Sequence, residues 1–234
     1  MILRNMFYNE EIFSRFLMML TQKQKENLFS ARVLVFGVGG VGSALVHMLV
    51  RAGIQNLSIV DFDTIDTTNI NRQLVAYSNN VGKLKVDELE TQLKSINPNI
   101  IIKKYPLKLS SETINEISFD CDYIVDCIDD ISAKKALIKL ANERNIPILS
   151  AMGAGNRFDE IPHFEIENIH NTSYDPIAKL LRKFCVKEGI NSLQVCYTKQ
   201  KAHKFDCKTI GSVVYYPISM ACAMCAKVIN DIIS

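Results

Sequence analysis

The chain has 234 residues, of which 48% are hydrophobic and 22% charged, and its formal net charge is +2. This composition is typical of a globular protein, and the length suits one α/β domain with a full core but is short for two. Seven scattered cysteines, in a chain too large to need disulfides for stability, favour free thiols in a reducing compartment.

The sequence lacks the pattern of a targeting or membrane segment. Glu10 and Glu11 stand where a signal peptide would need an apolar core. The longest apolar stretch, 215–234, contains Lys227 and Asp231 and looks too short to span a bilayer. We therefore expect a cytoplasmic protein with no transmembrane segment.

Strand-like and helix-like segments alternate through the first two thirds of the chain. The apolar run 32–37 is typical of a buried parallel strand, and apolar residues at helical spacing follow it from 41 to 52. After Gly155 the alternation loosens, and a closing helix is expected from Pro217. The other expected strands are 57–63, 99–105, 122–129, 146–155 and one near 193–198, and the other expected helices are 82–96, 110–117, 132–145 and 175–188.

This order predicts a Rossmann-like, doubly wound and mainly parallel α/β sheet with an extended C-terminal part. We expect a single domain over 1–234. It comprises an N-terminal helical arm (1–30), a nucleotide-binding core (31–155) and a C-terminal substrate-side part (156–234).

A glycine-rich turn joins the first strand to the first core helix. Gly37, Gly39 and Gly42 form the pattern G-x-G-x-x-G, and Gly40 lies within it. Glycines let backbone N–H groups approach a phosphate at the positive end of a helix. Asp61 ends the second strand 19 residues after Gly42, where a carboxylate can accept hydrogen bonds from a ribose. These features suit NAD, FAD or ATP about equally.

The residues after Asp61 separate these nucleotides. Asp63 points the same way as Asp61 at strand spacing, and a second carboxylate beside phosphates is repulsive unless it positions a cation or turns away. Arg72 can clamp phosphate oxygens, and Lys85 can reach the same phosphates. Asp126 and Asp129 end the fourth strand, where carboxylates suit Mg²⁺ bridging triphosphate oxygens. Together these groups predict attack at a phosphorus atom with pyrophosphate leaving.

The combined motifs resemble those of the adenylating enzymes related to ubiquitin-activating enzyme, which include bacterial activators of sulfur-carrier proteins. The matching motifs over 15–155 are GVGGVGS, DFD, N-x-N-R-Q, G-x-x-K and DCIDD. The resemblance implies ATP and Mg²⁺ as cofactors, Asp129 as the metal carboxylate, and a homodimer in which Arg15 reaches the partner's ATP. It also implies triphosphate contacts from the glycine loop and from Asn69, Arg72, Gln73 and Lys85.

Plainer interpretations of these residues remain open. Asn69 and Asn71 can cap a turn, and Lys85 can be a solvated residue on a helix surface. Cys222 and Cys225 form one Cys-x-x-Cys pair on an apolar helical face, which is half of a tetrahedral zinc site. A buried structural role suits this pair better, so zinc is not expected.

Two later motifs resemble a narrower group, the bacterial tRNA threonylcarbamoyladenosine dehydratases. They are the Gly-Ala-Gly turn 153–155 and the D-P-x-A-x-x-L-R pattern 175–182. The resemblance implies adenylation of the threonine carboxylate beside the tRNA anticodon, then intramolecular ring closure with net loss of water. It is also compatible with a monovalent cation as a further cofactor and with a sulfur-transfer protein as a helper. The alternatives are an activator of a sulfur-carrier or ubiquitin-like protein tail and a NAD-binding oxidoreductase.

A basic segment supplies candidates for RNA contact. Eight basic and three acidic residues between Thr172 and Lys208 give this segment a charge of +5. It is either a solvated face or a docking surface for a polyanion. Cys207 is a candidate acyl-accepting or redox thiol, although ring closure needs no thioester. The tRNA-contact candidates are Arg182, Lys183, Lys199, Lys201 and Lys204.

Overall fold

The computed structural model describes residues 11–110, 112–206 and 209–234, so Cys207 lies outside the described residues. A seven-stranded sheet has the order β3-β2-β1-β4-β5-β7-β6. All neighbouring pairs are parallel except β6 and β7, which are antiparallel. The predicted Rossmann-like sheet is therefore confirmed. The strands are β1 (Arg32–Phe36), β2 (Asn56–Val60), β3 (Ile101–Tyr105), β4 (Tyr123–Asp126), β5 (Ile148–Ala151), β6 (Glu165–Asn168) and β7 (Gln194–Tyr197).

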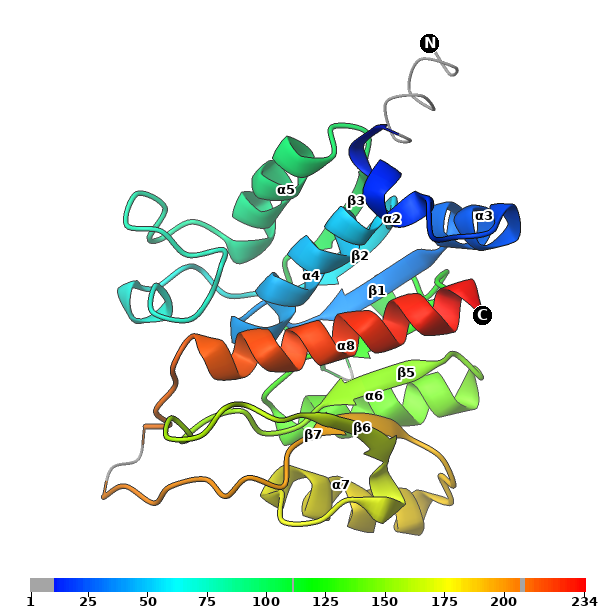
Figure 1. Cartoon of the computed structure of the whole chain (residues 1–234). Helices are drawn as coiled ribbons and strands as arrows, with labels where there is room; N and C mark the ends of the chain where they lie inside the picture. Colours follow the sequence, from blue (N-terminus) through cyan, green and yellow to red (C-terminus); the bar gives the residue numbers. More distant parts are fainter. Residues whose placement is uncertain (1–10, 111, 207–208) are drawn as a thin grey trace.

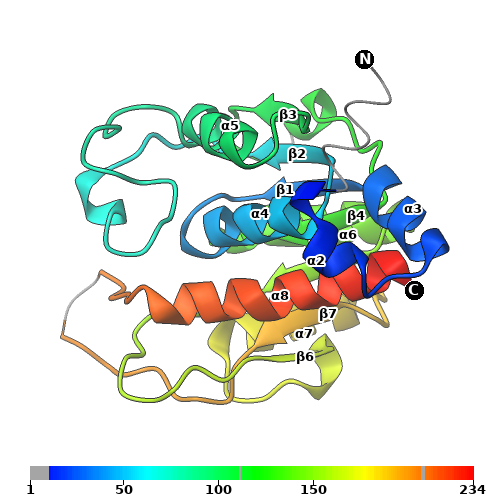
Figure 2. The ribbon, with the colours of Figure 1, turned by 45° about the horizontal axis from the view of Figure 1, so that its top comes forward.

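Helices cover both faces of the sheet (Figures 1 and 2). On one face, α4 and α8 lie side by side, with α2, α3 and α5 around them, and share one large hydrophobic core. On the other face, α6 and α7 cover two smaller cores. The helices are α2 (Ser14–Leu17), α3 (Gln22–Ser30), α4 (Gly40–Ala52), α5 (Lys85–Ile96), α6 (Ile131–Glu143), α7 (Pro176–Glu188) and α8 (Tyr215–Ile233).

The apolar run of β1 shows why the sheet needs helices on both sides. Val33 and Val35 pack into the core under α4, while Leu34 and Phe36 pack into the core under α6. Successive side chains of a strand point to opposite faces, so a strand buried on both faces must be apolar at every position. Because β1 and β4 are parallel neighbours in the middle of the sheet, their carboxyl ends lie side by side, where ligands bind in such folds.

Two segments differ from the expectation. The helix expected over 110–117 is only a short 3₁₀ turn, Ile114–Glu116. There the backbone N–H of Thr113 donates to Oγ of Ser110 and its hydroxyl donates to the carbonyl of Lys108, which favours a turn over a helix. The edge strand β6 is absent from the expected elements, because three of its four residues are polar and all four are only half-buried.

The closing helix α8 differs from the expectation in its length. By length and composition it could cross a membrane, contrary to the expectation that this stretch is too short. However, Met220, Met224 and Val228 on one face of α8 are fully buried in the core shared with α4. A buried core helix meets the same criterion of length and composition.

Candidate active site

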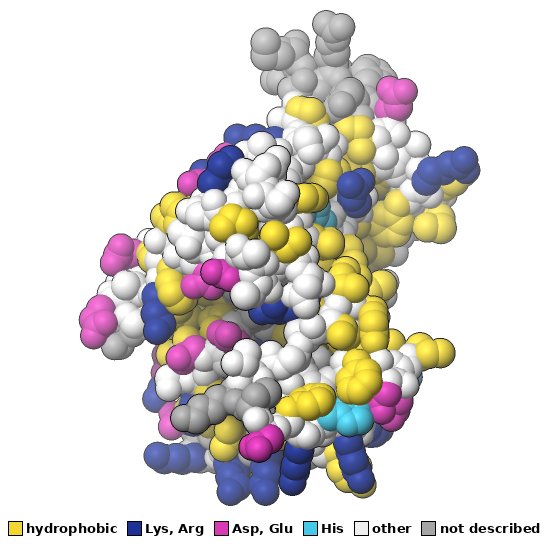
Figure 3. Space-filling view, turned by 90° about the vertical axis from the view of Figure 1, so that its left-hand side faces the viewer, with side chains coloured by type: hydrophobic (Ala, Val, Ile, Leu, Met, Phe, Trp, Pro, Cys, Tyr) yellow, Lys and Arg dark blue, Asp and Glu magenta, His cyan; other side chains and the backbone are white. Residues whose placement is uncertain are grey.

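A cavity of about 690 Å³ lies at the carboxyl ends of the central strands. Figure 3 shows the face of the molecule that bears it, which is hollowed near its centre. One wall comes from the glycine loop, the end of β2 and residues 69–73, and the opposite wall comes from the Gly-Ala-Gly turn and the segment before α8. The cavity therefore brings together most of the predicted site residues.

The glycines of the loop divide into two roles. Gly39 and Gly40 line the cavity, so their backbone is open to a ligand. Gly37 also lines it and has a φ of +81°. Gly42 is buried outside the lining, and a Cβ atom there would lie 1.9 Å from the carbonyl oxygen of Gly37. Gly42 thus allows α4 to pack tightly against the loop, and it acts on the ligand only through the loop's shape.

Asp61 holds the glycine loop in place. Its Oδ2 accepts a hydrogen bond from the backbone N–H of Val38 (2.7 Å), and its Oδ1 accepts one from Asp63 (2.8 Å). Burial raises the pKa of Asp61, and these two amides together with nearby Lys85 act in the opposite direction. The carboxylate lines the cavity, so a ribose hydroxyl there can donate to it.

The cation that Asp63 positions is Lys85. The Nζ of Lys85 lies 2.7 Å from Oδ2 of Asp63, and Lys85 is only 4% exposed. The alternative that Lys85 is a solvated surface residue is therefore wrong. Both groups line the cavity, and the ion pair fixes the ammonium group at the wall next to the loop.

Residues 69–73 combine turn capping with ligand access. Oδ1 of Asn69 accepts from the N–H of Asp66 (3.1 Å), so the capping interpretation is correct, yet Asn69 also lines the cavity. Arg72 donates to the carbonyl of Thr68 (2.7 Å) and faces the same space. Gln73 is buried there, and its Oε1 has no partner within the described part of the chain.

The carboxylates at the end of β4 and just after it lie in three environments. Asp129 and Asp130 are both exposed and line the cavity, but Asp130 also caps α6 by accepting from the N–H of Ala133 (2.8 Å). Asp126 is fully buried and pairs with Lys134 (2.8 Å), so the prediction that Asp126 faces a ligand is wrong. The hydroxyl of Ser150 also donates to Asp126 (2.5 Å).

Lys134 is a site residue that the sequence did not reveal. It is 1% exposed, lies on the inner face of α6 and reaches the cavity wall. A lysine in a helical pattern is ordinarily predicted to face solvent. The only signal in the sequence is its place, one turn before the buried Ile138 and next to the buried Ala133.

The Gly-Ala-Gly turn and the D-P-x-A-x-x-L-R helix form one structural unit. Asp175 caps α7 by accepting from the N–H groups of Ile177 (2.8 Å) and Ala178 (3.0 Å), and it also accepts from Gly153 (3.1 Å). Arg157, which is buried, donates to the carbonyls of Gly153 and Gly155. The second motif therefore frames the cavity wall opposite the glycine loop.

The remaining predicted residues lie outside the cavity. Arg15 is exposed on α2 and is not part of the lining. Cys222 is exposed, while Cys225 is buried, and burial raises the pKa of the Cys225 thiol to about 12. Among the described residues, no group of three or more histidines, cysteines and carboxylates could hold a metal ion by itself.

The RNA-contact candidates differ in how free their charges are. Lys183, Lys201 and Lys204 are exposed, and Figure 3 shows basic side chains gathered below the hollow. Lys199 forms an ion pair with Glu165 (2.8 Å). Arg182 is half-buried and donates to Thr172, which holds it against the protein.

The chain is similar to known proteins over most of its length. A model of the ThiF family matches residues 13–232. The chain is 37% identical over 190 residues to the tRNA threonylcarbamoyladenosine dehydratase of Bacillus subtilis, covering 80% of this chain and 74% of that one. The corresponding enzyme of Haemophilus influenzae is 35% identical over 162 residues, with 69% and 62% covered.

The fold is also similar to a solved structure. This is the E. coli tRNA N6-threonylcarbamoyladenosine dehydratase in complex with AMP, at a TM-score of 0.88 and 22% identity. The alignment covers 95% of this chain and 94% of that one.

Proposed function

The chain belongs to the ThiF family, and we propose on this basis that it is an ATP-dependent tRNA threonylcarbamoyladenosine dehydratase acting through an acyl-adenylate. The observation that carries the chemistry is one cavity in which Asp61, Arg72, Lys85 and Asp129 surround the glycine loop. The observation that carries the substrate is the identity to relatives bearing that name.

The nucleotide binds along the wall made by β1, β2 and residues 69–73. Asp61 accepts hydrogen bonds from the ribose, and the backbone N–H groups of the glycine loop donate to phosphate oxygens. Arg72 and Lys85 lie on the same wall and stabilise the charge that moves onto the leaving pyrophosphate. Because Asp63 holds Lys85 in place, the ammonium group needs little reorganisation when ATP binds.

The donor set fits one Mg²⁺ ion. Asp129 faces the cavity without a hydrogen-bond partner among the described residues, while Asp126 is occupied by Lys134. Mg²⁺ is commonly held by one or two carboxylates together with substrate phosphates and water. When bound, the ion would neutralise phosphate charge. Asp129 would hold it.

The reaction has two steps, and both involve the carboxyl group of the threonine side arm. A carboxylate oxygen of the threonine side arm attacks the α-phosphorus of ATP, forming an acyl-adenylate and releasing pyrophosphate. A carbamoyl nitrogen or oxygen of the same arm then attacks the activated carbonyl, the C–O bond to AMP breaks, and a proton is released. The oxygen lost from the nucleoside leaves in AMP. Ring closure is intramolecular and gains its rate from proximity.

The partners follow from the same proposal. The substrate is tRNA, and the exposed lysines 183, 201 and 204 contact its phosphates. The protein works as a homodimer in which Arg15 reaches the partner's nucleotide, since Arg15 lies outside the cavity of its own chain. It acts in the cytoplasm, where tRNA is modified.

The test is to incubate the protein with ATP, Mg²⁺ and tRNA carrying threonylcarbamoyladenosine, then digest the RNA and weigh the nucleosides. We expect ATP-dependent loss of one water. Lys85→Met should abolish the change, whereas the matched control Lys83→Met should not, because Lys83 is exposed and lies outside the cavity lining. No mass change, in a protein that still exchanges pyrophosphate into ATP with a carrier-protein tail, would assign it to activation of that tail.

A further inference from the structure

Three aromatic side chains form a row beside the mouth of the cavity. The ring of His203 lies 4.9 Å from that of Phe158 and 6.1 Å from that of Phe205, measured between centroids. Phe158 follows the Gly-Ala-Gly turn, whereas His203 and Phe205 lie on the loop after β7. Both phenylalanines are 51% exposed, so each leaves much of its ring to solvent.

Hydrogen bonds join this row to the cavity wall. The N–H of His203 donates to the carbonyl of Asn156 (2.7 Å), and the N–H of Asn156 donates to the carbonyl of Gly211 (2.8 Å). Gly155 and Ile210, the neighbours of these residues, line the cavity. The rings are therefore held at a fixed place next to the reaction site.

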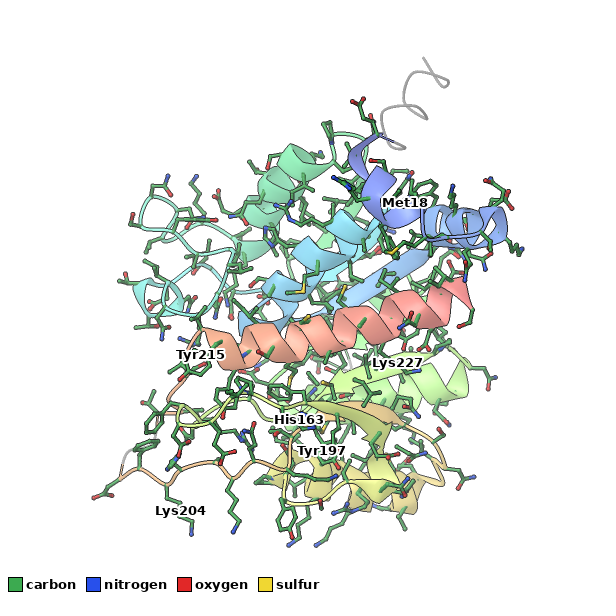
Figure 4. All side chains as sticks on the ribbon, in the orientation of Figure 1. Met18, His163, Tyr197, Lys204, Tyr215 and Lys227 are labelled. Carbon is green, nitrogen blue, oxygen red and sulfur yellow. The ribbon has the colours of Figure 1, made fainter. Side chains whose placement is uncertain are left out.

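The first residue of α8 braces the same row. The hydroxyl of Tyr215 donates to the carbonyl of Phe158, and Figure 4 shows Tyr215 at the start of that helix. Tyr215 is itself 41% exposed. A core helix thus supports the row from one side, while the rings face outward on the other.

Charged side chains of both signs lie beside the rings, with the lysines on the loop that carries His203 and Phe205. Lys201 and Lys204 are exposed on the loop that carries His203, and Figure 4 shows Lys204 extending from it. Nε2 of His203 lies 2.9 Å from Oδ1 of Asp159, and Asp159, Glu160 and Asp206 are all exposed. Aromatic rings interleaved with lysines are the combination that binds single-stranded nucleic acid, because bases stack on the rings and phosphates meet the cations.

We propose that Phe158, His203 and Phe205 form a stacking platform for the unpaired anticodon-loop nucleotides next to the modified adenosine. This inference rests on the proposed function and adds the part of the RNA that is recognised. A platform of this kind binds only splayed bases, since bases in a paired stem are stacked on each other and not accessible. It holds the neighbouring bases while the threonine arm enters the cavity.

The test measures binding of fluorescent RNA by anisotropy and turnover with tRNA. The probes are the anticodon stem-loop and a fully paired hairpin of equal length. Phe158→Ala and Phe205→Ala should each raise the Kd for the stem-loop about tenfold, or about 1.4 kcal/mol, with little change for the hairpin. Phe158→Trp, which keeps an aromatic ring, should bind the stem-loop with a Kd close to that of the wild type. Tyr77→Ala is the matched control, because Tyr77 is an aromatic residue of similar exposure (54%) outside the platform.

In turnover, the platform variants should raise KM for tRNA and leave kcat at saturating tRNA unchanged. ATP affinity, measured by calorimetry, should also stay unchanged in a platform variant. The platform would be overturned if the alanine variants lost affinity equally for the stem-loop and the hairpin, or if both variants kept the wild-type KM for tRNA. In that case, loss of water from the nucleoside with the wild-type protein would still support the proposed function. A wild-type protein that neither binds the stem-loop nor changes the nucleoside mass would overturn both.

Discussion

The buried pair of Lys134 and Asp126 allows a prediction with a defined magnitude. Lys134→Met removes the cation but leaves Asp126 fully buried, and among the described residues its remaining hydrogen bonds come from Ser150 and the N–H of Ile128. Breaking a buried ion pair in this way costs about 3–5 kcal/mol, since an uncompensated charge remains in the core. For a chain of this size, that loss lowers Tm by about 6–20 °C.

The assay is urea unfolding followed by circular dichroism, at equal protein concentration without nucleotide. Adding Asp126→Asn to Lys134→Met should recover more than half of the lost stability, because the charge is then gone. Lys139→Met is the control on the same helix. Lys139 pairs with Glu188 at the surface, and such pairs contribute about 1 kcal/mol or less. A Lys134→Met protein within 1 kcal/mol of the wild type would refute the reasoning.

Three further predictions concern the glycine loop, α7 and Asp129, the proposed metal carboxylate. Gly42→Ala should cost about 3 kcal/mol or more, since the new Cβ meets the backbone of Gly37, and an unchanged Tm would contradict this. Asp175→Ala should cost about 1–3 kcal/mol in urea unfolding through loss of the α7 cap and the bond to Gly153, with Asp175→Asn milder. Asp129→Asn should raise the Mg²⁺ concentration for half-maximal turnover about tenfold or more without lowering Tm, and chelation by EDTA should stop turnover. Wild-type Mg²⁺ dependence would remove Asp129 from the metal site.

The sheet and one wall of the cavity could be predicted because their signals are local. The run 33–36 is apolar at each position, and parallel strands place their carboxyl ends together, so the residues that follow them had to converge. Strand spacing predicted that Asp63 points the same way as Asp61, and left open whether Asp63 positions a cation or turns away. The structure then identified that cation as Lys85.

The missed features depend on contacts between distant parts of the chain. The buried ammonium group of Lys134, on α6, donates to Asp126 of β4 and Ser150 of β5. Asn71 looked like a turn cap, yet its amide donates to the carbonyl of Ser212, 141 residues later. No periodicity in a sequence records such a pairing. The single-domain division and the roles of Arg15 and Cys207 stay predictions.

The segment 209–214 is part of the wall opposite the glycine loop and is also hydrogen-bonded to the nucleotide wall, and this has a thermodynamic consequence. On the nucleotide wall Asn71 holds Ser212 (2.9 Å), and on the opposite wall Asn156 exchanges two hydrogen bonds with Gly211. A ligand that moves this segment on one side changes its position on the other. Linkage then requires reciprocity: whatever factor ATP contributes to the affinity for RNA, RNA contributes to the affinity for ATP. Asn71 and Asn156 lie outside the cavity lining, so substitutions there should change this coupling factor without removing a side chain from the cavity wall.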